Sequence, residues 1–332
     1  MGTGSSWVDV ALEERSPRGI VALLALFLGS LVVAAVMAPP VMRLARDLAE
    51  LWPTRPTLYL AEKELPRYFD RLRWLVVLAG LPWVARAAGI RDHVSLGLRL
   101  DGDRWRKAVG WLLVGLAMVG SMSGLQLLFG GARLRPVENG PALLETVLLA
   151  LLSALFIGVL EELVFRGVVL RAFLQATASG VWAIVLASLF FALVHFQRVP
   201  SDRWKGDSTS TTADALVVAW ESLRGSVSQI RWDLALGLFL AGSILCLVAM
   251  SARSLIPAMA LHGGWVWAAL VHRRLVETGG GGGVRLWGGR ALLDGAAPLA
   301  LLAVLLVAVA LRGKGALRAR SAVESAPPGG GS

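Results

Sequence analysis

The sequence predicts an all-α protein, a polytopic transmembrane helical bundle of about eight membrane helices with a polar cavity in its core. Hydrophobic residues make up 56% of the 332 residues, and the mean hydropathy is +0.65. Charged residues make up only 17%, below the roughly 25% of soluble domains. Hydrocarbon offers the backbone no hydrogen-bond partner, so such a chain crosses the bilayer as helices. We therefore expect an integral, multi-pass membrane protein.

Eight apolar segments carry this prediction, because several of them approach the roughly 20 residues that span a bilayer. The second segment is short and is interrupted by Pro82. We expect Pro39 and Pro40 to end the first helix, because proline lacks a backbone N–H and crowds the preceding turn. The segments are Gly19–Met37, Trp74–Ala88, Ala108–Phe129, Ala142–Leu163, Val181–Phe196, Leu234–Ser251, Leu255–Val271 and Ala291–Leu311.

The segments divide the chain into four regions. Residues 1–147 hold the N-terminal helices and an Arg-rich loop, which we expect to form an amphipathic helix on the membrane surface. Residues 148–271 hold the apolar helices that carry ionisable side chains and form the functional core. Residues 272–311 hold a Gly-rich linker and the last membrane helix, and residues 312–332 form a basic tail that we expect to be disordered.

The net charge of +10 lies mainly between the apolar segments. Basic loops beside membrane helices contact anionic lipid headgroups, so the lipid bilayer is the expected partner. A nucleic-acid partner would need a soluble basic domain, which we do not find. The chain is rich in Arg, Ala and Gly and has one Asn and few Lys, which suggests a GC-rich bacterial genome and hence a bacterial inner membrane. Membrane orientation, the exact number of spans and the oligomeric state stay open.

The stretch GVLEELVFRGVVL, residues 158–170, places three charges in an apolar segment. Glu162 and Arg166 are four residues apart, so they share a helix face and can pair. Glu161 lies about 100° away around the helix axis and needs another partner. A charge at the bilayer centre costs about 2.5–3.5 kcal/mol, whereas each large apolar residue returns only about 0.3–0.6 kcal/mol. This helix should therefore face the bundle interior or a wet cavity.

Two histidines also lie in apolar segments, His195 in SLFFALVHF and His262 in SLIPAMALHGGWVW. Helix–helix hydrogen bonds or an anchoring ion pair would explain a single buried ionisable residue. Two glutamates, one arginine and two histidines on three apolar helices instead predict a functional polar cavity.

These residues resemble the motifs of the intramembrane CPBP family, which includes the type II CAAX prenyl proteases and bacterial Abi-type proteins. The resemblance covers about Leu148–Leu270 and rests on two full motifs in the expected order. The matching residues are Glu161, Glu162 and Arg166 for EExxxR, Phe191 and His195 for FxxxH, and His262 for the first position of HxxxN or HxxxD.

The third motif departs from the family at its last position, where Val266 stands. In the family, asparagine at this position helps to hold the oxyanion or the geometry of the site. The indole N–H of Trp265 or Trp267 can donate a hydrogen bond in its place. Gly263 and Gly264 could instead let a backbone N–H approach the substrate. Whether Val266 reduces activity stays open.

The resemblance implies an intramembrane endopeptidase, a hydrolase that cuts a peptide bond in a membrane-anchored protein or peptide. The biological role would be removal of a C-terminal tail, processing of a sorting signal or maturation of a peptide. Glu161 would be the general base, and His195 would share and orient the water. His262 would donate to the developing oxyanion.

The remaining residues of the motifs would support this centre. Glu162, paired with Arg166, would fix the helix that carries Glu161. Phe191 would form the wall of the substrate pocket beside His195, and Trp265 would also belong to this pocket.

Three alternatives remain open at this point. Glu161, His195 and His262 form a plausible set of zinc ligands, although we prefer a site that needs no cofactor because EExxxR already orients Glu161. A serine protease would need a GxSG-like turn, but Ser121 replaces the first glycine before Ser123. The protein could also be catalytically weakened, or a non-enzymatic scaffold, immunity protein or component of a proton-coupled transporter.

Overall fold

A computed structural model describes residues 6–98, 102–130, 132–137, 139–197, 210–278 and 282–324, and this part of the chain is almost entirely helical. The all-α prediction is therefore confirmed, apart from the two-residue strands β1 and β2, which pair antiparallel with Arg133 opposite Glu277. The elements are α1 (Trp7–Glu13), α2 (Arg18–Leu51), α3 (Arg55–Ala61), α4 (Leu65–Ala87), α5 (Gly102–Phe129), β1 (Arg133–Leu134), α6 (Gly140–Glu162), the π-helix η1 (Leu163–Val169), α7 (Leu170–Thr177), α8 (Gly180–Val194), α9 (Thr212–Ser228), α10 (Trp232–Ala252), α11 (Ile256–Leu275), β2 (Val276–Glu277), α12 (Gly282–Trp287) and α13 (Ala296–Glu324).

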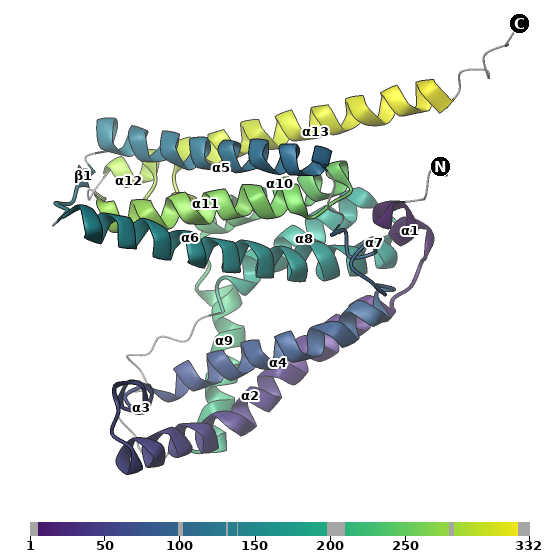
Figure 1. Cartoon of the computed structure of the whole chain (residues 1–332). Coiled ribbons are helices and arrows are strands. Elements are labelled where there is room, and N and C mark those ends of the chain that lie inside the picture. The colour runs from purple at the N-terminus through teal and green to yellow at the C-terminus, as the bar shows by residue number, and fades with distance from the viewer. Residues whose placement is uncertain are drawn as a thin grey trace, which may run out of the picture.

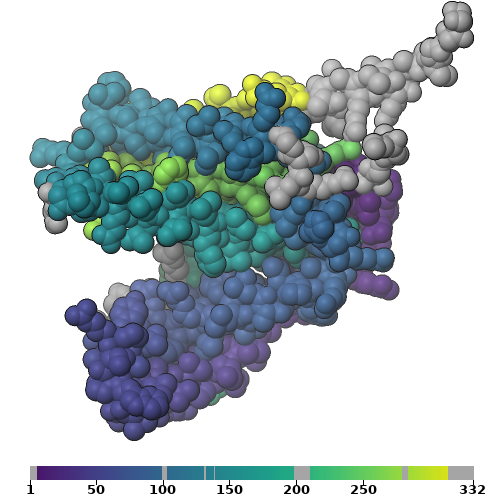
Figure 2. Space-filling view, viewed as in Figure 1, coloured from purple at the N-terminus to yellow at the C-terminus, as the bar shows by residue number. Residues whose placement is uncertain are grey.

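The helices form two parts that diverge from a common end (Figure 1). The body contains α5, α6, α8, α10, α11 and α13, and α11 packs against α5, α6 and α10. The arm is the antiparallel pair α2 and α4 with α3 at its tip, and α9 packs against α2 and α4. The space-filling view shows a cleft between arm and body that widens toward the tip of the arm (Figure 2).

Four helical stretches in the described part of the chain are long and apolar enough to cross a bilayer. Each of the eight predicted segments lies mostly on a helix, but α4 and α11 do not meet this criterion, and eight spans are not confirmed. Large apolar side chains cover the outer faces of α2 and α6, for example Leu28, Val32, Leu152 and Phe156, all more than half exposed. Lipid is the solvent that suits such surfaces. The four stretches are Arg18–Leu51, Asp103–Phe129, Gly140–Thr177 and Trp232–Ala252, and Gly180–Val194 and Ala296–Arg312 are shorter apolar helices.

The prediction that Pro39 and Pro40 end the first helix is wrong, because α2 continues to Leu51. Proline fixes φ at a helical value, so it costs about 3 kcal/mol in a helix interior without forbidding the conformation. Here Ala38 and Met42, on either side of the prolines, are buried in a core cluster with residues of α4 and α9. This tertiary packing offsets the cost and makes the arm one long helix.

The predicted boundaries also change. Helix α13 runs to Glu324, so residues 312–324 of the expected disordered tail are helical, and residues 325–332 lie outside the described part of the chain. Alanine and arginine, which favour helix, are frequent in this stretch. The expected Gly-rich linker contains β2 and α12. The boundaries at 147/148 and 271/272 fall inside α6 and α11, so they do not separate independent domains.

Glycines bring α11 close to α5 and α6 in the body. A Cβ atom placed on Gly264 would lie 2.8 Å from the carbonyl oxygen of Leu112 on α5. A Cβ atom on Gly158 of α6 would lie 3.1 Å from Cα of Gly263. Small residues let membrane helices approach in this way. The position of α11, and of the histidine that precedes these glycines, is therefore tightly determined.

Candidate active site

The helix that begins at Gly140 changes its hydrogen-bonding pattern at the predicted charged motif. Helix α6 ends at Glu162, residues 163–169 form the π-helix η1, and α7 continues from Leu170. Short π-helical turns are rare in proteins overall, and those that occur are often found at functional sites. Helix periodicity alone predicts a regular α-helix here, so the π-helical turn is a difference from the prediction.

The predicted pairing of Glu162 and Arg166 is confirmed. A guanidinium nitrogen, Nη1, of Arg166 lies 2.7 Å from Oε1 of Glu162, and the two side chains are 1% and 0% exposed. Arg166 also donates to the carbonyl oxygen of Gly242 on α10 at 3.3 Å. The guanidinium carbon lies 4.7 Å from the centroid of the Phe191 ring, a cation–π contact. Arg166 therefore joins η1 to α8 and α10.

His262 of α11 contacts both glutamates. Its Nδ1 lies 2.9 Å from Oε1 of Glu162, and its Nε2 lies 3.9 Å from Oε2 of Glu161. The carboxylate can only accept, so Nδ1–H donates to Glu162, and Nε2 is directed toward Glu161. Glu162 thus accepts from both Arg166 and His262 and holds two helices together.

His195 follows the last turn of α8. Its Nδ1 donates to the carbonyl oxygen of Phe191 at 2.7 Å, and the two ring centroids are 4.5 Å apart. Because Nδ1 carries the proton, Nε2 of the neutral ring is an acceptor. The side chain is exposed and lines a cavity of the body.

This cavity has a volume of about 530 Å³ and lies between helices of the body. Glu161, His195 and His262 all line it, so the structure brings together these three predicted residues. The side chain of Glu161 is 26% exposed, in contrast to the fully buried Glu162. Most of the other lining residues are apolar, and the remaining polar ones are Gln229, Arg231 and Arg273.

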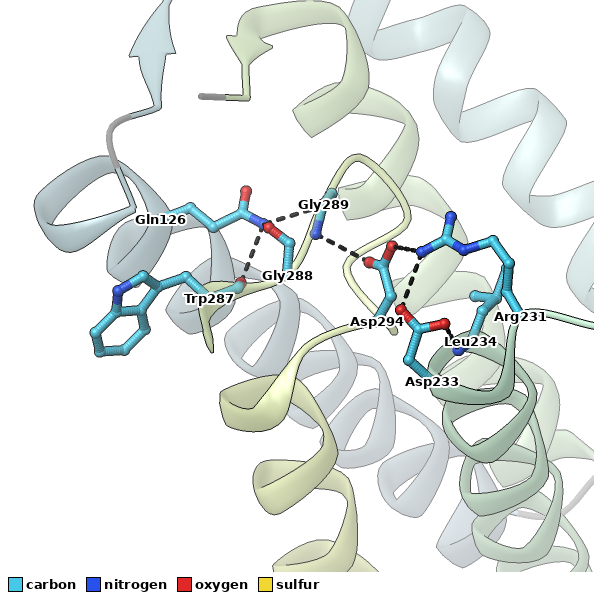
Figure 3. Close-up of polar contacts among 8 residues, drawn as sticks. All are labelled: Gln126, Arg231, Asp233, Leu234, Trp287, Gly288, Gly289 and Asp294. Atoms are coloured by element: carbon cyan, nitrogen blue, oxygen red, sulfur yellow. Dashed lines mark hydrogen bonds and ion pairs between the residues drawn. The ribbon is translucent and has the colours of Figure 1, made fainter. Parts of the chain in front are cut away.

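The loop of residues 288–295, which we call the cover loop, forms part of the cavity wall. Leu292 lines the cavity and is buried, although its φ of 57° is a left-handed conformation that leucine rarely adopts. Two anchors hold this loop (Figure 3). Asp294 accepts from the backbone N–H of Gly289 at 3.0 Å and pairs with Arg231. The side-chain amide of Gln126 on α5 donates to the carbonyl oxygens of residues 287, 288 and 289.

Sequence reasoning missed the cover loop and its anchors. The available signal was Asp294, a lone acid in the apolar stretch ALLDGAAPLA that follows two glycines and an arginine. In the structure, its carboxylate and that of Asp233 raise the pKa of Arg231 above the usual value. Arg231 therefore stays charged at the edge of the cavity.

The structure distinguishes the proposed substitutes for the missing asparagine by where each one lies and what it contacts. Val266 lines the cavity, as does the neighbouring Trp265, whose buried Nε1 has no hydrogen-bond partner among the described residues. Nε1 of Trp267 instead donates to the carbonyl oxygen of Val147 at 3.1 Å. Gly263 and Gly264 face the neighbouring helices. Of these substitutes, Trp265 lines the cavity and has a donor without a partner among the described residues, although this Nε1 atom is itself buried.

The structure also bears on the two enzyme alternatives, the zinc site and the serine protease. In the described part of the chain, no group of three or more His, Cys, Asp or Glu side chains is arranged to hold a metal ion. Glu161, His195 and His262 therefore do not fit a zinc site in this geometry. Ser123 donates its hydroxyl to the carbonyl oxygen of Val119 in its own helix at 2.8 Å, the local bond that serine commonly makes in a helix interior.

The fold and the site define a class of protein: a multi-pass helical membrane protein with a carboxylate–histidine centre inside its bundle. Residues 143–268 match the family described as type II CAAX prenyl endopeptidase Rce1-like. This match confirms the resemblance of this part of the chain to the CPBP family. No curated protein and no solved structure matches the chain.

Proposed function

We propose that the protein is an intramembrane endopeptidase that hydrolyses a peptide bond with a water molecule activated by Glu161 and His195. One observation carries the proposal. Glu162 is fully buried and held by Arg166 and His262, whereas Glu161 and His195 open onto the same cavity. A buried, doubly held carboxylate suits a structural role, and an accessible carboxylate beside an imidazole suits proton transfer.

The proposed reaction uses groups of this chain and one water. The water donates one hydrogen bond to Glu161 and one to Nε2 of His195, which accepts because Nδ1 is bonded to Phe191. Glu161 takes a proton as the water oxygen attacks the scissile carbonyl carbon. The protonated carboxyl group then gives this proton to the leaving amine as the peptide bond breaks.

The oxyanion of the tetrahedral intermediate needs donors that are already in place. Trp265 lines the cavity and its indole N–H, which is buried, has no partner in the described structure, so we propose that this group turns to the oxyanion when substrate binds. His262 also lines the cavity, with its Nε2 3.9 Å from Oε2 of Glu161, so its ring is the second candidate donor. The side chain of Val266 is apolar and cannot donate a hydrogen bond. Stabilisation of the oxyanion therefore depends more on Trp265 here than in a site that has asparagine at this position.

The substrate we propose is a membrane-anchored protein or peptide of a bacterial inner membrane. The cavity wall is mostly apolar, which suits a hydrophobic segment unwound from its helix, and the composition of the chain suggests a bacterial source. Val266 favours one alternative, a catalytically weakened protein that binds such segments without turning them over.

The proposal is tested by comparing membrane protein termini in cells that produce the wild type, Glu161→Gln or His195→Ala. Glu145→Gln is the matched control for the first variant, because Glu145 is an exposed glutamate on the same helix. His93→Ala, at an exposed loop position, is the control for the second. We expect new cleavage termini with the wild type and both controls only. Cleavage that persists in Glu161→Gln would contradict the proposal.

A further inference from the structure

A second cavity, of about 710 Å³, lies at the tip of the arm, far along the chain from the site in the body. The end of α2, helix α3 and the beginning of α4 enclose it. The tip of the arm lies away from the body in Figure 1, so this cavity is separate from the candidate active site. Its lining falls into a cationic side and an apolar side.

The cationic side consists of Lys63, Arg67 and Arg71. Arg67 and Arg71 are four residues apart on α4 and share one helix face, and Lys63, just before the helix, lines the same cavity. No acidic residue lines the cavity, and none of the three cations forms an ion pair in the described part of the chain. The ammonium of Lys63 instead lies 3.7 Å from the centroid of the Tyr59 ring. Arg67 and Arg71 are like charges one helical turn apart and repel each other, so an anion is the missing partner.

The apolar side consists of Val41, Leu44 and Leu48 of α2 together with leucines of α3 and α4. Spacings of three and four residues make the α2 residues a continuous stripe along one face. Leu44 is 56% exposed, although it belongs to the last turns of a helix that can span a membrane. This stripe therefore offers a surface for a hydrocarbon chain.

The position of the cavity identifies where the anion comes from. It lies at the end of the candidate span Arg18–Leu51, followed directly by the exposed Trp52. Tryptophan, tyrosine and basic residues gather where a span meets the headgroup region. An anion beside an apolar stripe at this depth matches a phospholipid better than a free ion.

We propose that the tip of the arm binds one anionic phospholipid, with its phosphate against Lys63, Arg67 and Arg71 and an acyl chain along Val41, Leu44 and Leu48. The lipid neutralises the cationic side and covers the apolar side at the same time. Because α2 and α4 are long packed helices, the bound lipid fixes the tip of the arm at the membrane surface. The site is independent of the proposed peptidase reaction.

The test uses the purified full chain in zwitterionic micelles, titrated with phosphatidylglycerol or phosphatidylcholine, with bound lipid counted by native mass spectrometry. Each basic side chain near a membrane surface contributes about fivefold to the affinity for an anionic lipid. The variant Lys63→Gln/Arg67→Gln/Arg71→Gln should therefore weaken phosphatidylglycerol binding about 100-fold and leave phosphatidylcholine binding unchanged. Leu44→Ser should weaken binding of the long-chain lipid only, compared with a short-chain analogue.

The matched control is Arg133→Gln/Arg135→Gln/Arg285→Gln, which removes the same charge from exposed positions on the body. It should bind phosphatidylglycerol as the wild type does. Three results would overturn the proposal: undiminished phosphatidylglycerol binding by the arm variant, equal loss in the control, or equal affinity of the wild type for phosphatidylcholine. Displacement of the lipid by inorganic phosphate at the same concentration would also overturn it, since it would show a site for the free ion.

Discussion

The adjacent glycines of α11 allow a matched test of how the helix beside the candidate active site is held. An alanine Cβ at 264 would lie 2.8 Å from the carbonyl oxygen of Leu112 and 3.4 Å from the backbone nitrogen of Leu116. Backbone atoms of α5 would have to move, and such overpacking costs about 1–3 kcal/mol. At 263, the nearest atom to an alanine Cβ is the carbonyl oxygen of Ala154 at 3.8 Å, an ordinary contact.

Both substitutions restrict the unfolded chain equally, a gain of about 0.4–1 kcal/mol for each variant. This gain cancels when the two variants are compared, so their difference reports the steric strain alone. We expect Gly264→Ala to be about 1–3 kcal/mol less stable than Gly263→Ala, and Gly263→Ala to be as stable as the wild type or slightly more stable.

The measurement is equilibrium unfolding of the purified protein in mixed micelles, followed by circular dichroism. Peptidase activity at a temperature where both variants are folded gives a second readout, because movement of α5 against α11 would displace His262. Equal stability of the two variants would refute the close packing of α11 on α5. A larger loss in Gly263→Ala would show that the helix is rotated relative to this structure.

Three further predictions concern the site. Arg166→Met leaves Glu162 buried without its cation, so we expect a loss of about 3–5 kcal/mol, while Arg166→Met/Glu162→Leu should recover most of it in the same unfolding assay; additive losses would contradict the buried pair. Trp265→Phe should lower kcat about 100-fold with little change in KM, because it removes an oxyanion donor, and Val266→Asn in that background should restore part of the rate; an unchanged kcat would exclude the donor role. Exhaustive chelation should leave cleavage unaffected, and a loss that added zinc reverses would refute the reaction proposed above.

Local features of the site could be predicted because they depend on helix periodicity. The spacing of four residues placed Glu162 and Arg166 on one face, and the ion pair forms despite the π-helical turn that follows Glu162. The difference in access between Glu161 and Glu162 also follows from this spacing. These relations involve neighbours on one helix, so they need no knowledge of the fold.

Relations between helices could not be predicted in the same way. The sequence analysis gave His262 the oxyanion, but the structure also bonds its Nδ1 to Glu162, 100 residues away in the chain. The sequence does not distinguish Trp265 from Trp267 as a free donor. In the structure, the carbonyl oxygen of Val147 on α6 accepts from Trp267, and no described residue accepts from Trp265. The prediction ended the first helix at Pro39 because the local cost of proline was visible and the packing that offsets it was not.

The sequence by itself determined the membrane class, the helical content and the residues of the carboxylate–histidine centre. Composition and helix periodicity act over a few turns, and a charge in an apolar helix is expensive wherever that helix packs. The tertiary structure decided which helices approach, how His262 links the two glutamates, and how Asp294 and Arg231 hold the cover loop. It also created the cavity at the tip of the arm. These features depend on close contacts between distant segments, and such contacts are set by the shape of the packed surfaces rather than by any local pattern.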